Sequence, residues 1–339
     1  MKNILIDVAV EPAFLNRLEG VAGISLEVIP ENTAPHEEPK ELLSGKQVLF
    51  CHLPPRNIDD MRELEWIQLA SSGYTQAIGL GLAARGVRVC NASGVFDTAI
   101  AEWNVAMMIN LLRDMRTMIR HQEAGVWDRS ARFQKELRGS VAGIWGYGGI
   151  GRETARLLKA HGVKVHVMTR GGVRPRNRQF VLPNVGDPEG ILPDRVFVKG
   201  QEAEFLEGLD FLILSMPLSD HTRGIIGERE LRLLPSHAYL LNPARGPLVQ
   251  EAALLHALRE GWIAGAALDT HYVYPMPADH PLWSFPNVIM TPHISGSVGN
   301  PYFLSRVWEL FVGNVERWRA GMPLLNEIAA AELDNPARN

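Results

Sequence analysis

Short apolar segments alternate with longer amphipathic segments along most of the chain. Strands are predicted at residues 3–8, 47–51, 66–69, 87–90, 163–169 and 209–215, and helices at residues 59–64, 98–120, 153–159 and 304–319. Strands that alternate with helices in this way form parallel sheets that helices cover on both faces. The pattern therefore predicts an α/β fold.

Three segments carry further expectations. From Thr98 to Arg120 apolar residues recur at three- and four-residue spacing, which predicts one long helix whose methionines pack in a core or a subunit interface. The stretch between Gly171 and Gly200 is rich in Gly, Pro and Arg, and we expect an extended loop or a surface insertion there. The amphipathic segment 304–319 is expected to pack against the amino-terminal region.

Length and composition narrow the class of protein. A chain of 339 residues is longer than one hydrophobic core usually grows, so two domains are expected. A net charge of −4 gives no general attraction for nucleic acid or for an anionic membrane surface, which favours a small-molecule partner. The two cysteines, the lack of an export pattern at Met1 and the lack of a long apolar run predict a cytoplasmic protein.

Glycines at 146, 148 and 151 have the G-x-G-x-x-G spacing of a dinucleotide-binding loop, with Gly149 and Ile150 between them. An apolar strand precedes the loop, and a helix and a second strand follow it, as in a Rossmann-like unit. Glycines let backbone amides approach a pyrophosphate, and the helix N-terminus supplies positive potential. A glycine turn that only packs tightly is the alternative, which this context disfavours.

The residues about 20 positions beyond the loop bear on the choice of cofactor. A carboxylate there usually binds the adenosine ribose and repels a 2′-phosphate, but this chain has Thr169 and Arg170. A hydroxyl and a guanidinium suit a phosphate, so NADP(H) is favoured and NAD(H) remains possible. Arg174, Arg176 and Arg178 follow, and they equally well fit a solvated surface loop.

Several ordered motifs follow the glycine loop. They are Met216-Pro217-Leu218 with Thr222, Leu241-Asn242-Pro243-Ala244-Arg245-Gly246, Ala266-Ala267-Leu268-Asp269 and Thr291-Pro292-His293-Ile294-Ser295-Gly296. In this order they resemble the D-isomer-specific 2-hydroxyacid dehydrogenases, and weaker similarity extends to Ser71–Tyr74 and Ala101-Glu102. Each residue alone would be better explained as a structural or surface residue; their order favours the functional interpretation.

The resemblance implies roles for these residues. Arg245 would bind the carboxylate and carbonyl oxygen of a 2-oxo acid, and His293 would protonate the alkoxide. Asp269 would hold the nicotinamide carboxamide, and backbone amides near Ser72 and Gly73 would receive the substrate carboxylate. Met216, Pro217, Thr222 and Asn242 would belong to the cofactor site.

One position departs from the family pattern. The family usually has a glutamate before a proline, five residues after the Asp269 position, where it raises the pKa of the histidine. This chain has Tyr274 before Pro275. A phenol carries no negative charge near neutral pH, so we expect His293 to titrate lower than in enzymes with the glutamate.

Two alternatives remain beside a reductase. The segment from Pro277 to Pro281 together with the Thr291–Gly296 motif also resembles formate dehydrogenases, but Phe96 falls where those enzymes use an asparagine to hold formate. A corepressor-like protein that senses NAD(P) without turnover is the second alternative. Retention of Arg245 and His293 argues against it.

Together these features predict two Rossmann-like domains with parallel sheets. The NAD(P)-binding domain, residues 99–296, is expected to be inserted in a split substrate domain of residues 1–98 and 297–339, with the site in the cleft between them. The predicted reaction is NADPH-dependent reduction of glyoxylate, hydroxypyruvate or a similar 2-oxo acid. The resemblance also implies a homodimer formed through the cofactor domains.

Overall fold

The chain divides into two α/β units, each built on its own parallel sheet. The computed structural model describes residues 1–130, 135–296 and 299–333. The first unit comprises the described residues within Met1–Phe96, Asn177–Leu182 and Val298–Asn339, and the second those within Asp97–Arg176 and Pro183–Ser297. Residues 297, 298 and 334–339 of the predicted substrate domain lie outside the described residues.

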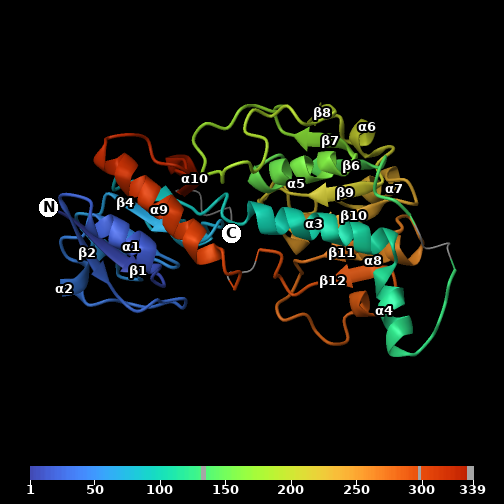
Figure 1. The fold of residues 1–339 in the computed structure, drawn as a ribbon, viewed down its shortest axis with the longest axis horizontal. Coiled ribbons are helices and arrows are strands. Elements are labelled where there is room, and N and C mark those ends of the chain that lie inside the picture. The colour runs from blue at the N-terminus through green and yellow to red at the C-terminus, as the bar shows by residue number, and fades with distance from the viewer. Residues whose placement is uncertain (131–134, 297–298, 334–339) are drawn as a thin grey trace. The chain divides into compact units, whose positions relative to one another are not determined.

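A parallel sheet with the strand order β2-β1-β3-β4-β5 forms the centre of the first unit (Figure 1). Its strands are β1 (Lys2–Asp7), β2 (Ile24–Val28), β3 (Val48–Cys51), β4 (Trp66–Leu69) and β5 (Arg88–Cys90). The helices of this unit are α1 (Pro12–Glu19), α2 (Lys40–Leu43), α9 (Phe303–Arg319) and α10 (Ala330–Leu333).

The carboxyl-terminal helix α9 belongs to the core of this first unit. Its Trp308 and Phe311 are fully buried, and the ring of Phe311 stacks on Phe50 of β3 at 4.2 Å between centroids. Helix α9 also contacts α1. The prediction that this amphipathic segment packs against the amino-terminal region is therefore confirmed.

The second unit contains a parallel sheet with the order β12-β11-β10-β9-β6-β7-β8. Its strands are β6 (Val141–Trp145), β7 (Lys164–Thr169), β8 (Arg195–Val198), β9 (Phe211–Leu214), β10 (Tyr239–Asn242), β11 (Gly265–Leu268) and β12 (Val288–Met290). Its helices are α3 (Asp97–Leu112), α4 (Met115–Glu123), α5 (Gly149–Ala160), α6 (Glu202–Leu206), α7 (Glu228–Leu233) and α8 (Glu251–Arg259).

Both faces of this second sheet are buried. Along β9, Phe211 and Ile213 pack in one cluster with residues of α3 and α5, whereas Leu212 and Leu214 pack in another with residues of α6, α7 and α8. A strand buried on both faces is continuously apolar rather than alternating. The predicted α/β fold with two parallel sheets is confirmed.

Two predictions about elements were wrong. The single helix over residues 98–120 is two helices, because Asp114 between them adopts a left-handed backbone conformation with φ of 45°. The helix at 59–64 is only a short 3₁₀ turn, Ile58–Asp60. The stretch 171–200 is loop for most of its length, in keeping with the prediction, and it adds the strand β8, which pairs with β7 at the edge of the sheet.

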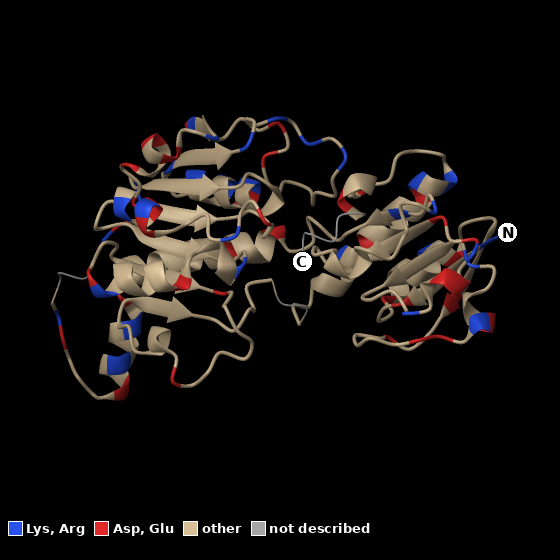
Figure 2. Ribbon diagram, turned by 180° about the vertical axis from the view of Figure 1, so that it is seen from behind, with Lys and Arg blue, Asp and Glu red and all other residues tan. Residues whose placement is uncertain are grey.

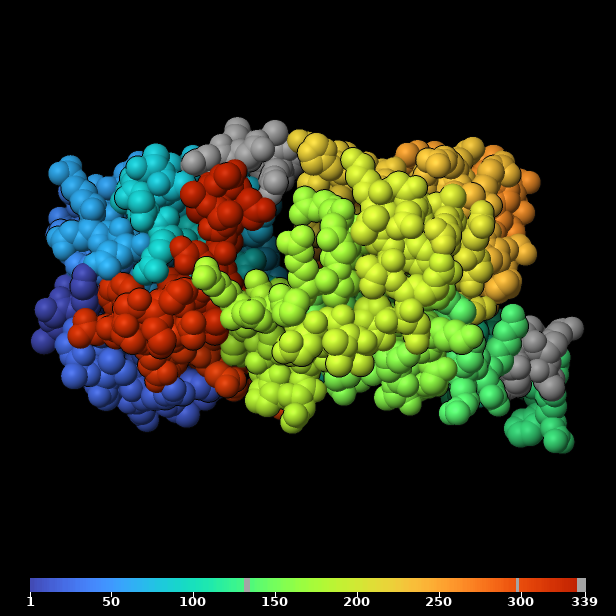
Figure 3. Space-filling model, turned by 90° about the horizontal axis from the view of Figure 1, so that it is seen from above, coloured from blue at the N-terminus to red at the C-terminus, as the bar shows by residue number. Residues whose placement is uncertain are grey.

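The stretch before β8 contributes a short piece to the first unit. Phe180 is buried there, its backbone N–H donates to Oδ1 of Asn326 at 2.9 Å, and Asn326 N–H donates to the Arg178 carbonyl at 3.0 Å. The rest of the stretch, yellow-green in Figure 3, lies on the surface of the second unit.

Surface charge is mixed. Segments with Lys and Arg are intermixed with segments with Asp and Glu in both units (Figure 2), in keeping with the small net charge. Within residues 1–130, 135–296 and 299–333, none of the helices combines the length and the apolar character that crossing a membrane requires.

Candidate active site

The predicted site residues of the second unit share one edge of its sheet. The glycine loop follows β6, Thr169 ends β7, Met216 comes just after β9, and Arg245, Asp269 and His293 follow β10, β11 and β12. All of these strands are parallel, so their carboxyl ends lie at the same edge. The strand order reverses between β6 and β9, which is where doubly wound sheets bind their ligands.

Close packing explains two of the motif glycines. Gly146 has φ of 102°, and a Cβ there would lie 2.5 Å from the carbonyl oxygen of Ser215. A Cβ at Gly151 would lie 2.5 Å from the carbonyl oxygen of Gly146. Neither position has room for a side chain, because each faces backbone.

Gly148 is different, since a Cβ there would meet nothing within 4 Å. It is exposed and is the N-cap of α5, which begins at Gly149 without a side-chain cap hydrogen bond. A helix N-terminus with open space in front of it suits a phosphate group. Two hydroxyls at the same sheet edge, those of Thr169 at the end of β7 and Ser215 directly after β9, are shielded from solvent and lack a hydrogen-bond partner among the described residues. These features fit a dinucleotide.

The arginines beyond Thr169 fall into different environments. Arg170, Arg174 and Arg178 are exposed, whereas Arg176 is partly buried. Desolvation lowers the pKa of the Arg176 guanidinium, and the charges acting on it are those of Asp97 and Arg152. The carboxylate of Asp97 lies against Gly149, where a Cβ would meet it at 1.9 Å. Arg176 is therefore close to the start of α5.

A network that the sequence did not indicate links the stretch before β8 (residues 171–194, called the inserted segment below) to the glycine loop and the start of α5. Tyr147 donates its hydroxyl hydrogen to Asp187 at 2.7 Å, and the guanidinium of the buried Arg152 donates to the Asp187 carbonyl. Glu153, which is fully buried, accepts from the N–H of Gly186 at 2.6 Å. Each contact joins residues more than 30 positions apart, so no local pattern could reveal it.

Asn242 at the end of β10 shapes the turn that carries Arg245. Its Oδ1 accepts from the N–H groups of Ala244 (3.1 Å) and Arg245 (3.2 Å), and its Nδ2 donates to the Arg245 carbonyl at 2.9 Å. The Arg245 side chain is exposed, with Nη1 donating to the Ala244 carbonyl at 2.7 Å. The guanidinium fork is thus held on a defined turn at the carboxyl edge.

Asp269 holds the loop that carries His293. Its carboxylate is fully buried and accepts from the Thr291 hydroxyl, from the N–H of Ile294 at 2.9 Å, and from the N–H and hydroxyl of Ser295. Its carbonyl accepts from the N–H of His293 at 2.8 Å. These bonds support the left-handed backbone of His293, whose φ of 58° is uncommon for a residue other than glycine.

The imidazole of His293 contacts the ring of Tyr274 and lies within range of the positive charge of Arg245. The ring centroids of His293 and Tyr274 are 5.6 Å apart, and the phenol oxygen accepts from the N–H of His271 at 3.0 Å. Desolvation is the main cause that lowers the pKa of His293, and the positive charge of Arg245 lowers it further. Asp269 opposes both effects and His271 adds to them.

The remaining predicted residues form turns. Thr222 donates its hydroxyl hydrogen to the Pro217 carbonyl at 2.8 Å, which closes the turn after the buried Met216. In the first unit, Ser72 and Gly73 lie in the turn after β4. The Ser72 hydroxyl donates to the Ala92 carbonyl at 3.1 Å, and the Gly73 carbonyl accepts from the Ser71 hydroxyl.

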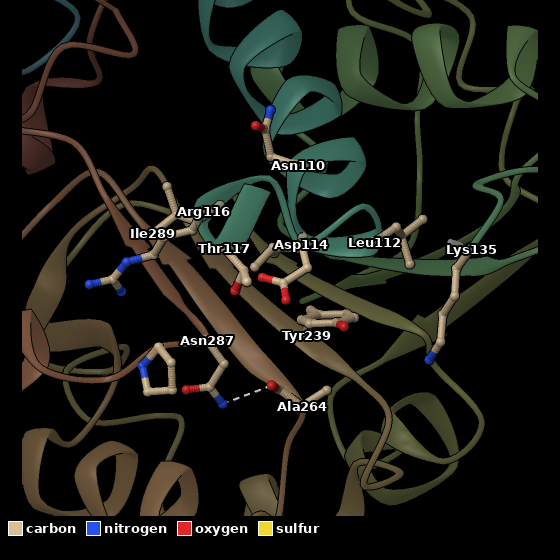
Figure 4. A pocket seen from close by; sticks show the side chains of 12 residues that line it. Asn110, Leu112, Asp114, Arg116, Thr117, Lys135, Tyr239, Ala264, Asn287 and Ile289 are labelled. Carbon is tan, nitrogen blue, oxygen red and sulfur yellow. Dashed lines mark hydrogen bonds between the residues drawn. The ribbon is translucent and has the colours of Figure 1, made fainter. Parts of the chain in front are cut away.

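A cavity of about 350 Å³ in the second unit is not this site (Figure 4). Its lining includes Tyr239 at the start of β10, Ala264 before β11 and Asn287 before β12. The Asn287 side-chain amide donates to the Ala264 carbonyl at 2.8 Å. These residues mark the amino-terminal edge of the sheet, opposite the edge where the motifs gather.

The doubly wound sheet, the glycine loop and the charged carboxyl-edge loops define a nicotinamide-dependent oxidoreductase. Residues 105–295, more than half of the chain, match the family model for the NAD binding domain of D-isomer specific 2-hydroxyacid dehydrogenases. The chain belongs to this family, as the sequence motifs predicted. It is an NAD(P)-dependent D-2-hydroxyacid dehydrogenase family enzyme.

Individual relatives agree with this assignment. A glyoxylate reductase from Thermofilum pendens is 32% identical over 77% of this chain and 75% of its own length. A family protein from Aeromonas salmonicida has the same fold, with 24% identity, a TM-score of 0.77 and coverage of 97% and 99% of the two chains. An NADPH-dependent glyoxylate/hydroxypyruvate reductase from Sinorhizobium meliloti is also similar, with 23% identity, a TM-score of 0.74 and coverage of 98% and 99%.

Proposed function

We propose that the protein reduces a small 2-oxo acid, such as glyoxylate or hydroxypyruvate, to the D-2-hydroxy acid with NADPH; glyoxylate gives the achiral glycolate. One observation carries the proposal. Arg245 and His293 follow strands of the same parallel sheet, and the charge of Arg245 acts on the imidazole of His293. A guanidinium beside a proton donor is what reduction of a carbonyl next to a carboxylate requires.

Each residue has a role in this proposal. Arg245 binds the carboxylate and polarises the carbonyl oxygen, where negative charge develops. His293 gives its proton to that oxygen. Backbone amides at Ser72 and Gly73 receive the substrate carboxylate. When bound, the cofactor supplies the hydride.

The glycine loop and the turns around it would hold the dinucleotide. Gly148 leaves room for the pyrophosphate before α5, and Gly146, Gly149, Ile150 and Gly151 form the rest of the loop. Met216, Pro217, Thr222 and Asn242 lie at the same sheet edge and belong to the proposed cofactor site. The Asp269 carboxylate is fully buried and already accepts from Thr291, Ile294 and Ser295, so Asp269 would shape the loop beside the nicotinamide carboxamide rather than bind the carboxamide itself. Thr169 and Arg170, in place of a carboxylate, support a preference for NADP(H) over NAD(H).

The two alternatives find less support. Formate dehydrogenation would need a side-chain amide at position 96 to hold formate. The residue there is Phe96, whose ring stacks on Phe303 at 5.3 Å between centroids. A cofactor-sensing corepressor would not need both Arg245 and His293, and the chain retains both residues. We also infer a homodimer formed through the NAD(P)-binding domains, on family resemblance.

Turnover with a panel of 2-oxo acids tests the function. Purified protein is mixed with NADPH or NADH and with glyoxylate, hydroxypyruvate or larger 2-oxo acids, and cofactor absorbance is followed. We expect oxidation of NADPH, faster than of NADH, with the small acids. Cofactor binding without turnover of any acid would contradict a reductase and favour the corepressor-like alternative, and reduction of NADP⁺ by formate would favour the dehydrogenase.

A further inference from the structure

His271 occupies a central place among the carboxyl-edge loops. It follows Asp269 by two residues and precedes Tyr274 by three, and only 7% of its surface is exposed. Its ring centroid lies 6.1 Å from that of Tyr274. A histidine buried at this point needs a physical reason.

Two hydrogen bonds join His271 to residues close to His293: one to Thr291, two positions earlier in the chain, and one to Tyr274. Its Nε2 lies 2.8 Å from the carbonyl oxygen of Thr291, and because a carbonyl only accepts, Nε2 carries the hydrogen. Its backbone N–H donates to the Tyr274 hydroxyl oxygen at 3.0 Å. Thr291 begins the loop that leads to His293, and the Tyr274 ring contacts the His293 ring.

The loop after β10 closes on His271 from another direction. A Cβ at Gly246 would lie 2.5 Å from the carbonyl carbon and oxygen of His271. Gly246 directly follows Arg245, so His271 packs against the turn that carries the guanidinium. One residue therefore contacts the loops after three adjacent strands.

The polar atoms of the His271 ring show why a histidine is placed here. Nδ1 is shielded from solvent and has no hydrogen-bond partner among the described residues. Burying an unpaired nitrogen costs free energy that a phenylalanine ring would not incur. The bond from Nε2 to the Thr291 carbonyl is the contact that offsets this cost.

We propose that His271 is a positioning residue for the reduction: through Thr291 and Tyr274 it orients His293. The proposal rests on the proposed function. The charged or titratable groups facing His293 in the described chain are Arg245 from the loop after β10, and Asp269, His271 and Tyr274 from the loop after β11.

Three substitutions separate positioning from packing. His271→Phe keeps the ring volume and removes the bond to the Thr291 carbonyl, whereas His271→Gln keeps an amide donor near the Nε2 position. His271→Asn keeps an amide that is too short to reach, and it serves if His271→Phe does not fold. His237→Phe is the matched control, since His237 is exposed and lies at the amino-terminal edge of the sheet.

The first readout is kcat against pH for 2-oxo acid reduction with NADPH. A displaced proton donor should lower kcat by roughly 10- to 100-fold in His271→Phe, with little change in the KM for the acid. The midpoint of the pH profile should move to higher pH, because His271 is one of the groups that lower the pKa of His293. His271→Gln should recover most of kcat, and His237→Phe should match the wild type.

The second readout does not depend on turnover. In the cofactor-free protein with labelled histidine, NMR follows the His293 imidazole, assigned with a His293→Gln variant. We expect its titration midpoint to rise in His271→Phe. Wild-type behaviour of His271→Phe in both readouts would overturn the proposal, as would a loss that His271→Gln does not reverse. If the wild type reduced no 2-oxo acid, the proposed function would fail, and the NMR titration alone would decide the role of His271.

Discussion

Burial of His293 and the charges around it set the pH range in which this residue could donate a proton. Desolvation and the Arg245 guanidinium both lower the pKa of His293, so the imidazole loses its proton at a lower pH than an ordinary histidine. The proposed reduction needs the protonated form of His293, and kcat should therefore fall as the pH rises through that lowered pKa. Tyr274 contacts the His293 ring and adds no negative charge beside it.

A carboxylate in place of Tyr274 should oppose this lowering of the His293 pKa. In Tyr274→Glu a negative charge beside His293 favours the imidazolium, and we expect the midpoint of the kcat profile to move up by roughly one pH unit or more. Tyr274→Phe adds no charge and should leave the midpoint close to that of the wild type. Coincident midpoints for the glutamate variant and the wild type would refute this account of Tyr274.

Arg245 provides the second prediction about a single residue. Arg245→Lys keeps the positive charge but removes the planar fork, so the substrate carboxylate and carbonyl can no longer be bound together. We expect kcat/KM for the 2-oxo acid to fall by about 100-fold or more. The Kd for NADPH, measured by fluorescence, should not change. The control is Arg259→Lys at the exposed end of α8, and an Arg245→Lys enzyme as active as that control would exclude the proposed role.

At the scale of elements, two glycines between β6 and α5 are needed for different reasons. A methyl group at Gly148 points into open space, whereas one at Gly151 meets the Gly146 carbonyl oxygen at 2.5 Å. Gly148→Ala should therefore fold normally and lose at least tenfold in NADPH affinity, because the methyl group occupies the approach to the helix N-terminus. Gly151→Ala should lose about 1–3 kcal/mol of stability.

Thermal melting and NADPH titration of the two variants test this contrast. If Gly148→Ala bound NADPH as the wild type does, the space before α5 would not be the pyrophosphate site. Equal melting temperatures for Gly151→Ala and the wild type would show that the close contact relaxes freely.

The inserted segment gives a second prediction at this scale. Desolvation alone would raise the pKa of Asp187, but the Tyr147 hydroxyl, the N–H groups of Leu192 and Ile191 and the charge of Arg152 together lower it. A carboxyl with a lowered pKa stabilises the fold above its ordinary pKa, and this contribution is lost as the pH falls through the lowered value. Acid should therefore release the segment from the glycine loop.

Tyr147→Phe should have a related effect at neutral pH. Loss of a hydrogen bond to a charged carboxylate costs about 1.5–3 kcal/mol, so amides of residues 183–192 should exchange hydrogen faster by at least tenfold. Exchange measured by mass spectrometry would show this, with amides of β1 as the internal reference. Unchanged exchange in 183–192 would mean that Asp187 is held by its backbone donors alone.

The elements also show which features can be predicted from sequence. The glycine loop and the motifs near Arg245, Asp269 and His293 were found because each is a local pattern after a short apolar strand. The break at Asp114 was missed, since the apolar spacing continues across it and nothing in the periodicity marks a left-handed residue. The role of Asn242 under Arg245 and the bonds to Asp269 depend on side-chain geometry that spacing alone does not reveal.

At the scale of the whole molecule, each unit has its own buried core. In the first, residues of β1, β3 and β4 pack with α9 from the far end of the sequence and with Phe180 from the inserted segment. In the second, the cores lie on the two faces of the seven-stranded sheet. The contribution of Phe180 could not be predicted, because its partners Gly94 and Asn326 lie far from it in the sequence, on opposite sides.

Separate cores predict that the cofactor stabilises mainly the second unit. A ligand at 100 times its Kd raises the free energy of opening of the unit that binds it by about 2.7 kcal/mol. This rise slows hydrogen exchange in that unit by about 100-fold. With NADPH we expect this slowing for core amides of β6, β7 and β9, and little change for β1, β3 and β4. The Gly148→Ala variant at the same NADPH concentration is the control and should show much less. Equal slowing in both sheets would mean that the units open together, since a ligand bound to one would then protect the whole chain.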